Sequence, residues 1–212
     1  MRRTNCLILC AAMLCTLGQL AAQSIELPPA QKSGGLPLMD ALAKRATARA
    51  FDPAEISRQD LSNVLWAAFG INRPDGKRTA PSARDCREAE IYVLLKQNVF
   101  LYEAAKNQLA QISAEDARAV GGMQAFVKDA PVTLVLVADL AKMGSASADD
   151  KKPYAYINAG YISQNVYLYC TSTGLATGVR AMIDRAVLAS KLKLRADELV
   201  VVAQSIGRPT RP

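Results

Sequence analysis

One short apolar run limits the folds that are open to this chain. Residues 132–138 read Val-Thr-Leu-Val-Leu-Val-Ala and have the length of a strand. A strand that lacks alternating polar residues is buried on both of its faces. The run therefore predicts a central strand in a sheet that is covered on both sides.

Hydrophobic periodicity, together with Gly, Pro and helix-capping residues, predicts the other secondary-structure elements. Their predicted order is α, α, β, β, α, β, α, β, α, β. The clearest helix begins after Ser57, carries an i, i+3, i+4 apolar pattern and ends at Gly70. A helix over 154–173 is apolar nearly all round, which is typical of a core helix or a subunit interface. This pattern, without repeats or linkers, predicts one α/β domain. The remaining predicted helices begin at Pro37, Ser113 and Asp184, the remaining strands span 91–95, 99–102, 178–183 and 199–203, and loops span 72–84 and 144–152.

The first 22 residues have the features of an export signal. Arg2 and Arg3 precede an apolar run over 7–20, and small residues up to Ala22 form a cleavage region. The apolar run is too short and too interrupted to span a membrane. The alternative to a cleaved export signal is a lipoprotein signal with Cys15 as the lipidated residue. We expect a periplasmic or secreted protein without a further membrane segment. The expected organisation is a signal peptide over 1–22, an extended, exposed lead-in over 23–36 and one domain over 37–212.

The composition excludes several classes of enzyme because the chain contains no histidine. Ser-His-Asp and Cys-His nucleophiles, HExxH metalloproteases and most catalytic zinc sites all require one. Outside the signal region only Cys86 and Cys170 remain, so no protein-held metal is expected, and the two are either a disulfide or free thiols. An enzyme of this composition is expected to use a bound organic cofactor.

The charge pattern does not indicate nucleic acid. The formal net charge is +7, and loss of Arg2 and Arg3 with the signal leaves +5. We find no stripe of Lys and Arg interleaved with aromatic residues, so a solvated surface with one anion site is the simpler interpretation. The chain also lacks GxGxxG after a first strand and lacks GxxxxGK[ST], so neither a Rossmann nor a P-loop site is indicated.

Three segments stand above this background. Arg45 and Arg49, with Thr47 between them, are predicted at the end of one helix and can converge on an anion; the alternative is a helix C-terminal cap with solvated charges. The small residues within 78–84 allow a flat ligand to approach the backbone, unless this is an ordinary polar loop. Residues 174–181 can offer main-chain N–H groups to a cofactor, unless they only pack in the core.

In order and spacing these segments resemble the FMN-dependent nitroreductase superfamily, and in particular its SagB/ThcOx-like branch. The likeness covers residues 36–209. Seven motifs carry it, although Ala46 replaces an often polar residue and Arg84-Asp85-Cys86 stands where relatives often carry Asn. The motifs are Lys44-Arg45-Ala46-Thr47-Ala48-Arg49-Ala50-Phe51, Val64-Leu65-Trp66-Ala67-Ala68-Phe69-Gly70, Pro81-Ser82-Ala83, Ala130-Pro131, Ala159-Gly160-Tyr161-Ile162-Ser163-Gln164-Asn165, Gly174-Leu175-Ala176-Thr177 and Gly207-Arg208-Pro209.

The resemblance implies a three-layer α/β sandwich with a central mixed sheet, and a homodimer with an FMN site between its protomers. It implies that the FMN phosphate and ribityl chain contact Arg45, Ala46, Thr47 and Arg49, with Arg208 or Arg211 completing the phosphate site. It implies flavin contacts from the partner subunit at Pro81, Ser82 and Ala83. It places Val179, Arg180, Ala181 and Met182 along the isoalloxazine, with the Ala181 N–H toward N5, Arg180 as a cation near N1, and Gln124 as a further contact.

The activity implied by the resemblance is a ping-pong oxidoreduction. A reduced donor such as NAD(P)H passes electrons through the flavin to a nitroaromatic, quinone or other small acceptor, and no side chain acts as a nucleophile. The alternative is a non-catalytic or degenerate exported flavin-binding protein that keeps the fold.

Overall fold

The central strand is β5 (Val132–Asp139), all eight residues of which are buried. Leu134 and Leu136 belong to one hydrophobic cluster, and Val135 and Val137 belong to a second cluster on the opposite face. Side chains alternate between faces along a strand, so β5 is covered on both sides, as its apolar run predicts. The computed structural model describes residues 24–210. The predicted signal peptide over 1–22 and Arg211 lie outside the described residues.

Seven strands form one sheet in the order β1-β4-β3-β2-β5-β7-β6, and every pair of neighbours in it is antiparallel. The expectation of a mixed sheet is therefore wrong for the described strands. Short turns join β2 to β3 and β3 to β4, and such turns require antiparallel pairing. The strands β5 and β6 run in the same direction, but β7 lies between them. The other strands are β1 (Ser24–Glu26), β2 (Ala89–Leu94), β3 (Val99–Glu103), β4 (Gln108–Ser113), β6 (Ala176–Arg180) and β7 (Glu198–Gly207).

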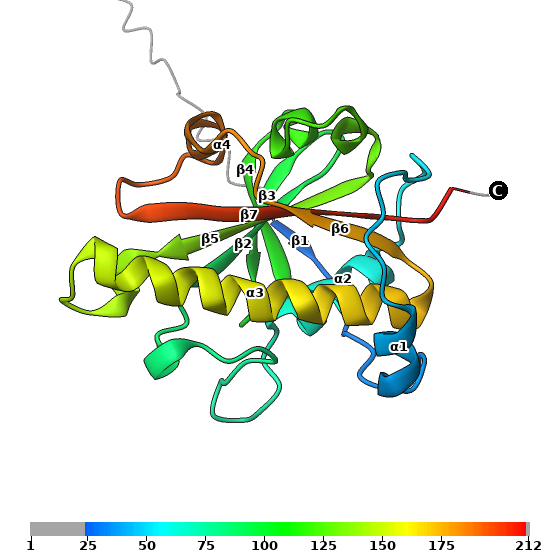
Figure 1. Cartoon of the computed structure of the whole chain (residues 1–212), viewed down its shortest axis with the longest axis horizontal. Helices are drawn as coiled ribbons and strands as arrows, with labels where there is room; N and C mark the ends of the chain where they lie inside the picture. Colours follow the sequence, from blue (N-terminus) through cyan, green and yellow to red (C-terminus); the bar gives the residue numbers. More distant parts are fainter. Residues whose placement is uncertain (1–23, 211–212) are drawn as a thin grey trace, which may run out of the picture.

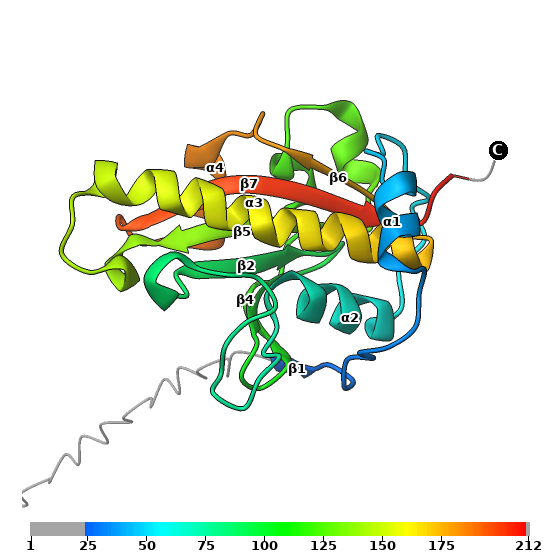
Figure 2. The same ribbon diagram turned by 60° about the horizontal axis from the view of Figure 1, so that its bottom comes forward.

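Helices cover both faces of the sheet and complete the three-layer sandwich (Figures 1 and 2). The helices α1 (Leu38–Lys44), α2 (Arg58–Phe69) and α3 (Ala148–Thr173) lie on one face, and α4 (Arg185–Leu192) lies on the other with two 3₁₀ helices. The predicted cap of α2 is confirmed, because Ser57 Oγ accepts a hydrogen bond of 3.0 Å from Asp60 N–H. Among residues 24–210 no helix combines the length and apolarity needed to cross a bilayer.

The helix predicted from Ser113 toward Val127 is wrong. This segment contains the end of β4 and two 3₁₀ helices, Arg118–Gly121 and Ala125–Asp129. Between them the chain is extended at Gly122, with φ 173° and ψ 164°, and a Cβ there would overlap the side chain of Arg180. The acidic residues at 115 and 116 that suggest a helix N-terminus instead pair with Lys191 and Arg118.

Two other segments are more ordered than the sequence predicts. Within the expected exposed lead-in, Ser24–Glu26 forms the edge strand β1 against β4, and Leu27 N–H donates a 3.0 Å hydrogen bond to Asn107 O. The helix α3 begins at Ala148, inside the expected loop over 144–152, because Ser147 Oγ caps it by accepting a 3.2 Å hydrogen bond from Asp150 N–H.

Candidate functional site

Three segments of the chain meet at Tyr167, a buried residue of α3. Its hydroxyl shares a 3.0 Å hydrogen bond with Thr47 Oγ1 and accepts another of 3.0 Å from Val179 N–H. The guanidinium carbon of Arg45 lies 5.2 Å from the centroid of the phenol ring, which is within cation–π range. One side chain therefore fixes Arg45, Thr47 and the strand β6 relative to α3.

The segment that carries the predicted anion ligands is extended. Helix α1 ends one residue before Arg45, which has φ −55° and ψ 120°, and Ala48 N–H then donates a 2.9 Å hydrogen bond to Thr177 O of β6. The prediction that both arginines lie at one helix end is therefore wrong for Arg49. Arg45 and Thr47 both contact Tyr167 and so lie on the same side of the segment, and Arg49 follows two residues later.

This close approach depends on Gly178 of β6. A Cβ at Gly178 would overlap the carbonyl oxygen of Ala48 and lie 3.3 Å from Thr47 Cγ2. Arg45, Ala46, Thr47 and Arg49 are all exposed beside it. Neither arginine forms an ion pair with a carboxylate of residues 24–210. The segment therefore presents two uncompensated forked cations and a hydroxyl, a donor set that suits a phosphate.

Arg208 reaches the far end of the same segment. Its carbonyl oxygen accepts a 3.0 Å hydrogen bond from Asp52 N–H, which makes an isolated bridge between the two residues. Its guanidinium lies 3.4 Å from Asp60 of α2. The structure thus brings Arg208 close in the fold to residues 45–52, whereas Arg211 lies outside the described residues.

Arg180, the last residue of β6, points into the fold and is buried. Its Nε donates a 2.6 Å hydrogen bond to Gly121 O, and its Nη1 donates one of 3.0 Å to Ser205 Oγ. Burial lowers the pKa of Arg180 to about 10, so the side chain remains charged at neutral pH. Its Nη2 has no hydrogen-bond partner among the described residues, although such a buried donor normally has one.

Residues 181, 182 and 124 gather just beyond the end of β6. Ala181 and Met182 are exposed, and Met182 O accepts a 3.2 Å hydrogen bond from Met123 N–H. Gln124 Nε2 lies 3.8 Å from Met182 Sδ, and Gln124 Oε1 is buried without a partner in the described part of the chain. The structure thus places Gln124 beside the predicted ligands of β6, with one polar atom unsatisfied.

A buried polar network holds the loop that carries Pro81, Ser82 and Ala83. Ser82 Oγ donates a 2.7 Å hydrogen bond to Glu88, whose other carboxylate oxygen accepts a 2.7 Å bond from Asn158 Nδ2 of α3. Asn158 Oδ1 in turn accepts a hydrogen bond of 3.3 Å from Ala83 N–H. Glu88 is fully buried, so this network ties the loop firmly to the N-terminal half of α3.

The loop and the Tyr167 cluster lie far apart along α3. Asn158 holds the loop and Tyr167 holds the cluster, and nine residues of helix span about 13 Å. The two groups of predicted flavin ligands therefore do not converge on one flavin phosphate within a single protomer.

The N-terminal half of α3, around Asn158, exposes an apolar face. Tyr154, Ile157 and Tyr161 follow helical spacing, and each is between 43 and 51% exposed. On the neighbouring helix α1, Leu38 and Met39 are 62 and 73% exposed. The helix predicted to be apolar all round thus packs one side against the sheet and leaves another side uncovered in the described chain.

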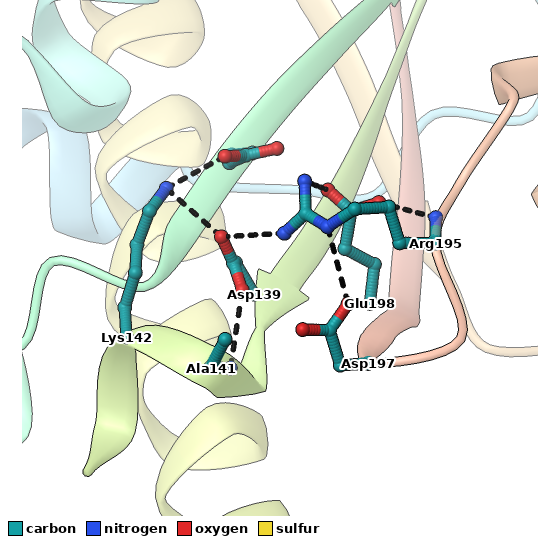
Figure 3. Close-up of polar contacts among 7 residues, drawn as sticks. Asp139, Ala141, Lys142, Arg195, Asp197 and Glu198 are labelled. Atoms are coloured by element: carbon teal, nitrogen blue, oxygen red, sulfur yellow. Dashed lines mark hydrogen bonds and ion pairs between the residues drawn. The ribbon is translucent and has the colours of Figure 1, made fainter.

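A separate cluster of charges lies where β5 ends and β2 and β7 begin (Figure 3). Carboxylate oxygens of Glu90, Asp139 and Glu198 lie within 4.8 Å of one another, but cations already pair with them. Asp139 lies 3.4 Å from Lys142 and 2.9 Å from Arg195, and Lys142 lies 2.6 Å from Glu90. Burial acts to raise the pKa of Asp139, but Arg195 and Lys142 outweigh it and hold that pKa below its usual range. The arrangement is an ion-pair network.

The two cysteines of the described chain are free thiols, so the structure does not adopt the disulfide alternative. Cys170 is buried, and burial raises the pKa of its thiol. Cys86 is half-buried in the turn after Ala83.

Tyr167, Glu88 and Asn158 organise the site, yet none is among the residues predicted for it. A glutamate just before an apolar strand and an asparagine in an apolar helix are signals of buried, hydrogen-bonded partners. Tyr167 gives no such signal, because it lies in a run of apolar residues and its role depends on contacts 12 and 120 residues away in sequence.

Comparison with known proteins matches this architecture to one family. The model of the Nitroreductase family matches residues 42–208. A protein of Methanocaldococcus jannaschii, provisionally named a nitroreductase, is 28% identical over 195 residues, which cover 87% of this chain and 96% of the relative. A crystal structure from Ralstonia eutropha with the same provisional name is 36% identical, has a TM-score of 0.85, and covers 89% of this chain and 90% of its own. One from Anabaena variabilis is 19% identical with a TM-score of 0.74, and the match covers 89% of this chain and 42% of that one. The chain therefore belongs to the nitroreductase family.

Proposed function

We propose that this nitroreductase-family chain is an FMN-dependent oxidoreductase. The observation that carries the proposal is the exposed row of Arg45, Thr47 and Arg49, which Tyr167 holds against β6. Two guanidinium groups that pair with no carboxylate of residues 24–210, together with a hydroxyl, within five consecutive residues match the needs of a phosphomonoester. The donor without a partner at Arg180 Nη2 fits a ligand with acceptor atoms near β6.

Different residues of the site would bind different parts of the FMN molecule. Arg45 and Arg49 would bind the phosphate, Thr47 the adjacent hydroxyl-rich chain, and the exposed main chain at Ala181 the ring system. When bound, FMN would supply the reversible uptake of two electrons that a donor such as NAD(P)H delivers and a nitroaromatic, quinone or other small acceptor removes. Arg180 keeps a positive charge in a buried position beneath β6, where it stabilises negative charge more strongly than it would in water.

We also propose that two copies form the working unit. The Pro81–Ser82–Ala83 loop and the Arg45 cluster are held at two points of α3 about 13 Å apart, and a second protomer would bring the loop of one copy to the flavin held by the other. The exposed Tyr154, Ile157 and Tyr161 lie on α3 around Asn158, which anchors the loop, and offer the apolar face for that contact.

The dimer is tested by placing a charge on this face. Ile157→Asp is expected to give a monomeric mass by light scattering and to lose FMN, because a buried unpaired carboxylate opposes association. Val187→Asp is the control, since Val187 is 39% exposed on α4, on the opposite face of the sheet. A dimer that persists in Ile157→Asp at micromolar concentration places the interface elsewhere.

Export is a further proposal that rests on the sequence of the first 22 residues. The full chain expressed in a Gram-negative host is expected in the periplasm, with a mature N-terminus after Ala22. Recovery of the uncleaved chain from the cytoplasm would contradict it.

The cofactor proposal is tested by the visible spectrum of the protein after FMN addition and desalting. Flavin bands that stay with the protein support the proposal, and a colourless protein that cannot retain FMN contradicts it and favours a degenerate, non-catalytic protein. Arg45→Ala removes a charge-assisted contact and is expected to weaken FMN binding by ~1.5–3 kcal/mol, which is roughly 10- to 150-fold. Lys96→Ala, on the turn between β2 and β3, removes the same charge and is expected to bind FMN normally. Equal FMN affinity in the two variants would remove Arg45 from the site.

A further inference from the structure

A second concentration of positive charge lies outside the Arg45 cluster. The loop over residues 72–87 encloses a cavity of about 180 Å³, which we call the basic pocket. An adjoining cavity of about 250 Å³ shares Arg78 and Arg87 in its wall. Four cations face a single carboxylate, that of Asp85, in the lining of the basic pocket. The residues that shape it are Arg73, Lys77, Arg78, Pro81, Ser82 and Arg87.

Two of these cations are not compensated by acids. Arg87 forms a two-pronged ion pair with Asp85, at 2.9 and 2.7 Å, and Lys77 lies 3.2 Å from Asp75. Arg73 and Arg78 pair with no carboxylate among residues 24–210. Arg73 lies against the backbone of Arg78, because Arg73 Nη2 donates a 3.5 Å hydrogen bond to Arg78 O. The pocket thus has an excess of positive charge that solvent or an anion must balance.

Arg78 is the least satisfied of these cations. Its guanidinium carbon lies 5.1 Å from the ring centroid of Phe69, and its Nη1 donates a 3.2 Å hydrogen bond to Phe69 O. Its Nε is buried and has no partner in the described part of the chain. Burial and the nearby charge of Arg87 lower the pKa of Arg78. A bound anion would supply the missing acceptor and relieve the repulsion between Arg78 and Arg87.

The wall of the pocket is held in a strained conformation. Arg84, Asp85 and Arg87 have φ of 56, 55 and 50°, a region that residues with a Cβ rarely adopt. Ser82 Oγ fixes the turn, because it accepts a 2.9 Å hydrogen bond from Arg87 N–H while donating to the buried Glu88. Strain of this kind persists only where the surrounding structure imposes it, and it is concentrated at ligand sites.

We propose that the basic pocket binds the phosphate groups of the electron donor, a nicotinamide dinucleotide. The proposal rests on the proposed function, in which Pro81 and Ser82 face the flavin of the partner subunit. The same two residues wall the basic pocket, so a donor whose nicotinamide reaches that flavin has its diphosphate close to Arg73, Arg78 and Arg87. Two arginine forks without a carboxylate partner among residues 24–210, beside the Asp85-paired Arg87, suit a polyanionic diphosphate better than a single carboxylate.

Two titrations test the proposal on the FMN-loaded protein. Calorimetry with inorganic pyrophosphate measures the anion site directly, and steady-state kinetics measure KM and kcat for NADPH. Arg73→Ala is expected to weaken pyrophosphate binding at least fivefold and to raise KM for NADPH by a similar factor with little change in kcat, because the contact is distant from the reacting atoms. Arg78→Met, which keeps the packing on Phe69, is expected to act in the same direction. Lys96→Ala, the matched loss of charge, is expected to change neither quantity.

The outcomes separate this proposal from the cofactor proposal. Arg45→Ala is expected to weaken FMN binding while leaving the pyrophosphate titration unchanged, because the two sites are distinct. Protein that fails to retain FMN contradicts the proposed function, and the pyrophosphate titrations of Arg45→Ala and Arg73→Ala still report on the pocket. Unchanged pyrophosphate affinity in both Arg73→Ala and Arg78→Met overturns the site. Weakened pyrophosphate binding with an unchanged KM for NADPH overturns its assignment to the donor.

Discussion

Removing one oxygen atom from Tyr167 tests how the phosphate-binding segment is held. Tyr167→Phe keeps the ring that Arg45 stacks on but deletes the hydroxyl that binds Thr47 and Val179. Two hydrogen bonds are lost, each contributing about 0.5–1.5 kcal/mol, and the partly buried Val179 N–H loses its acceptor. We expect the free energy of unfolding to fall by ~1–3 kcal/mol, which corresponds to roughly 2–12 °C in Tm for a domain of this size.

The same change is expected to affect the cofactor. Without the hydroxyl, Thr47 is no longer fixed beside Arg45, so FMN binding is expected to weaken by ~1 kcal/mol, or about fivefold. Urea unfolding of the apoprotein, with an unchanged m-value, and fluorescence titration with FMN measure the two effects separately.

Tyr156→Phe is the control because Tyr156 lies on the same helix but is 48% exposed. It is expected to leave the stability within ~0.5 kcal/mol of the starting protein, as exposed substitutions usually do. If Tyr167→Phe behaves like this control in both assays, then Tyr167 does not organise the segment, and the reasoning from its hydroxyl fails.

Two further changes address the backbone contact and the ion-pair network. Gly178→Ala introduces a Cβ where Ala48 O lies, so FMN affinity is expected to fall at least tenfold while the circular dichroism spectrum stays native. Full FMN affinity in this variant would show that residues 45–49 can move away from β6 without loss of binding. Asp139→Asn removes a carboxylate whose pKa is held low, and we expect ~1–3 kcal/mol less stability at pH 7, because its cations lose their partner. A carboxyl group whose pKa is lower in the folded state than in the unfolded state stabilises the fold at pH values above the unfolded pKa, which is about 3.8 for Asp139. The difference in stability between the starting protein and Asp139→Asn is therefore expected to persist from pH 6 to 8 and to shrink below about pH 4. A difference that grows on acidification would contradict the assignment.

The sequence predicts those parts of the fold whose signals are local. The predictions of the buried strand β5 and the capped helix α2 are both confirmed. Burial on two faces and an N-cap each produce a recognisable pattern within a few consecutive residues. The strands β1 and β4 are missed because their pairing joins residues more than 80 positions apart, and β4 buries only Leu109. The 113–127 segment is misassigned because its acidic first turn resembles a helix start, whereas the glycines at 121 and 122 make room for Arg180.

The candidate site follows the same division. Arg45, Thr47 and the end of β6 come together as the resemblance implies, although whether they bind FMN stays a prediction. The extended course of the chain through Arg49 was not predictable, because it depends on the missing Cβ of Gly178. The inward direction of Arg180 likewise depends on Gly121 and Ser205, which are distant in sequence.

The three-residue strand β1 determines what the sheet presents to other molecules. Because β1 pairs with β4, the N–H and C=O groups of Gln108 to Ala110 on that side face their own chain. Loss of residues 24–26 would leave β4 as an open edge, and an unpaired edge is a template for strands of neighbouring chains. The core clusters that surround β5 would remain, so the expected result of such trimming is a folded protein that self-associates. The resistance of this protein to self-association therefore depends on residues 24–26, which contribute little to the core.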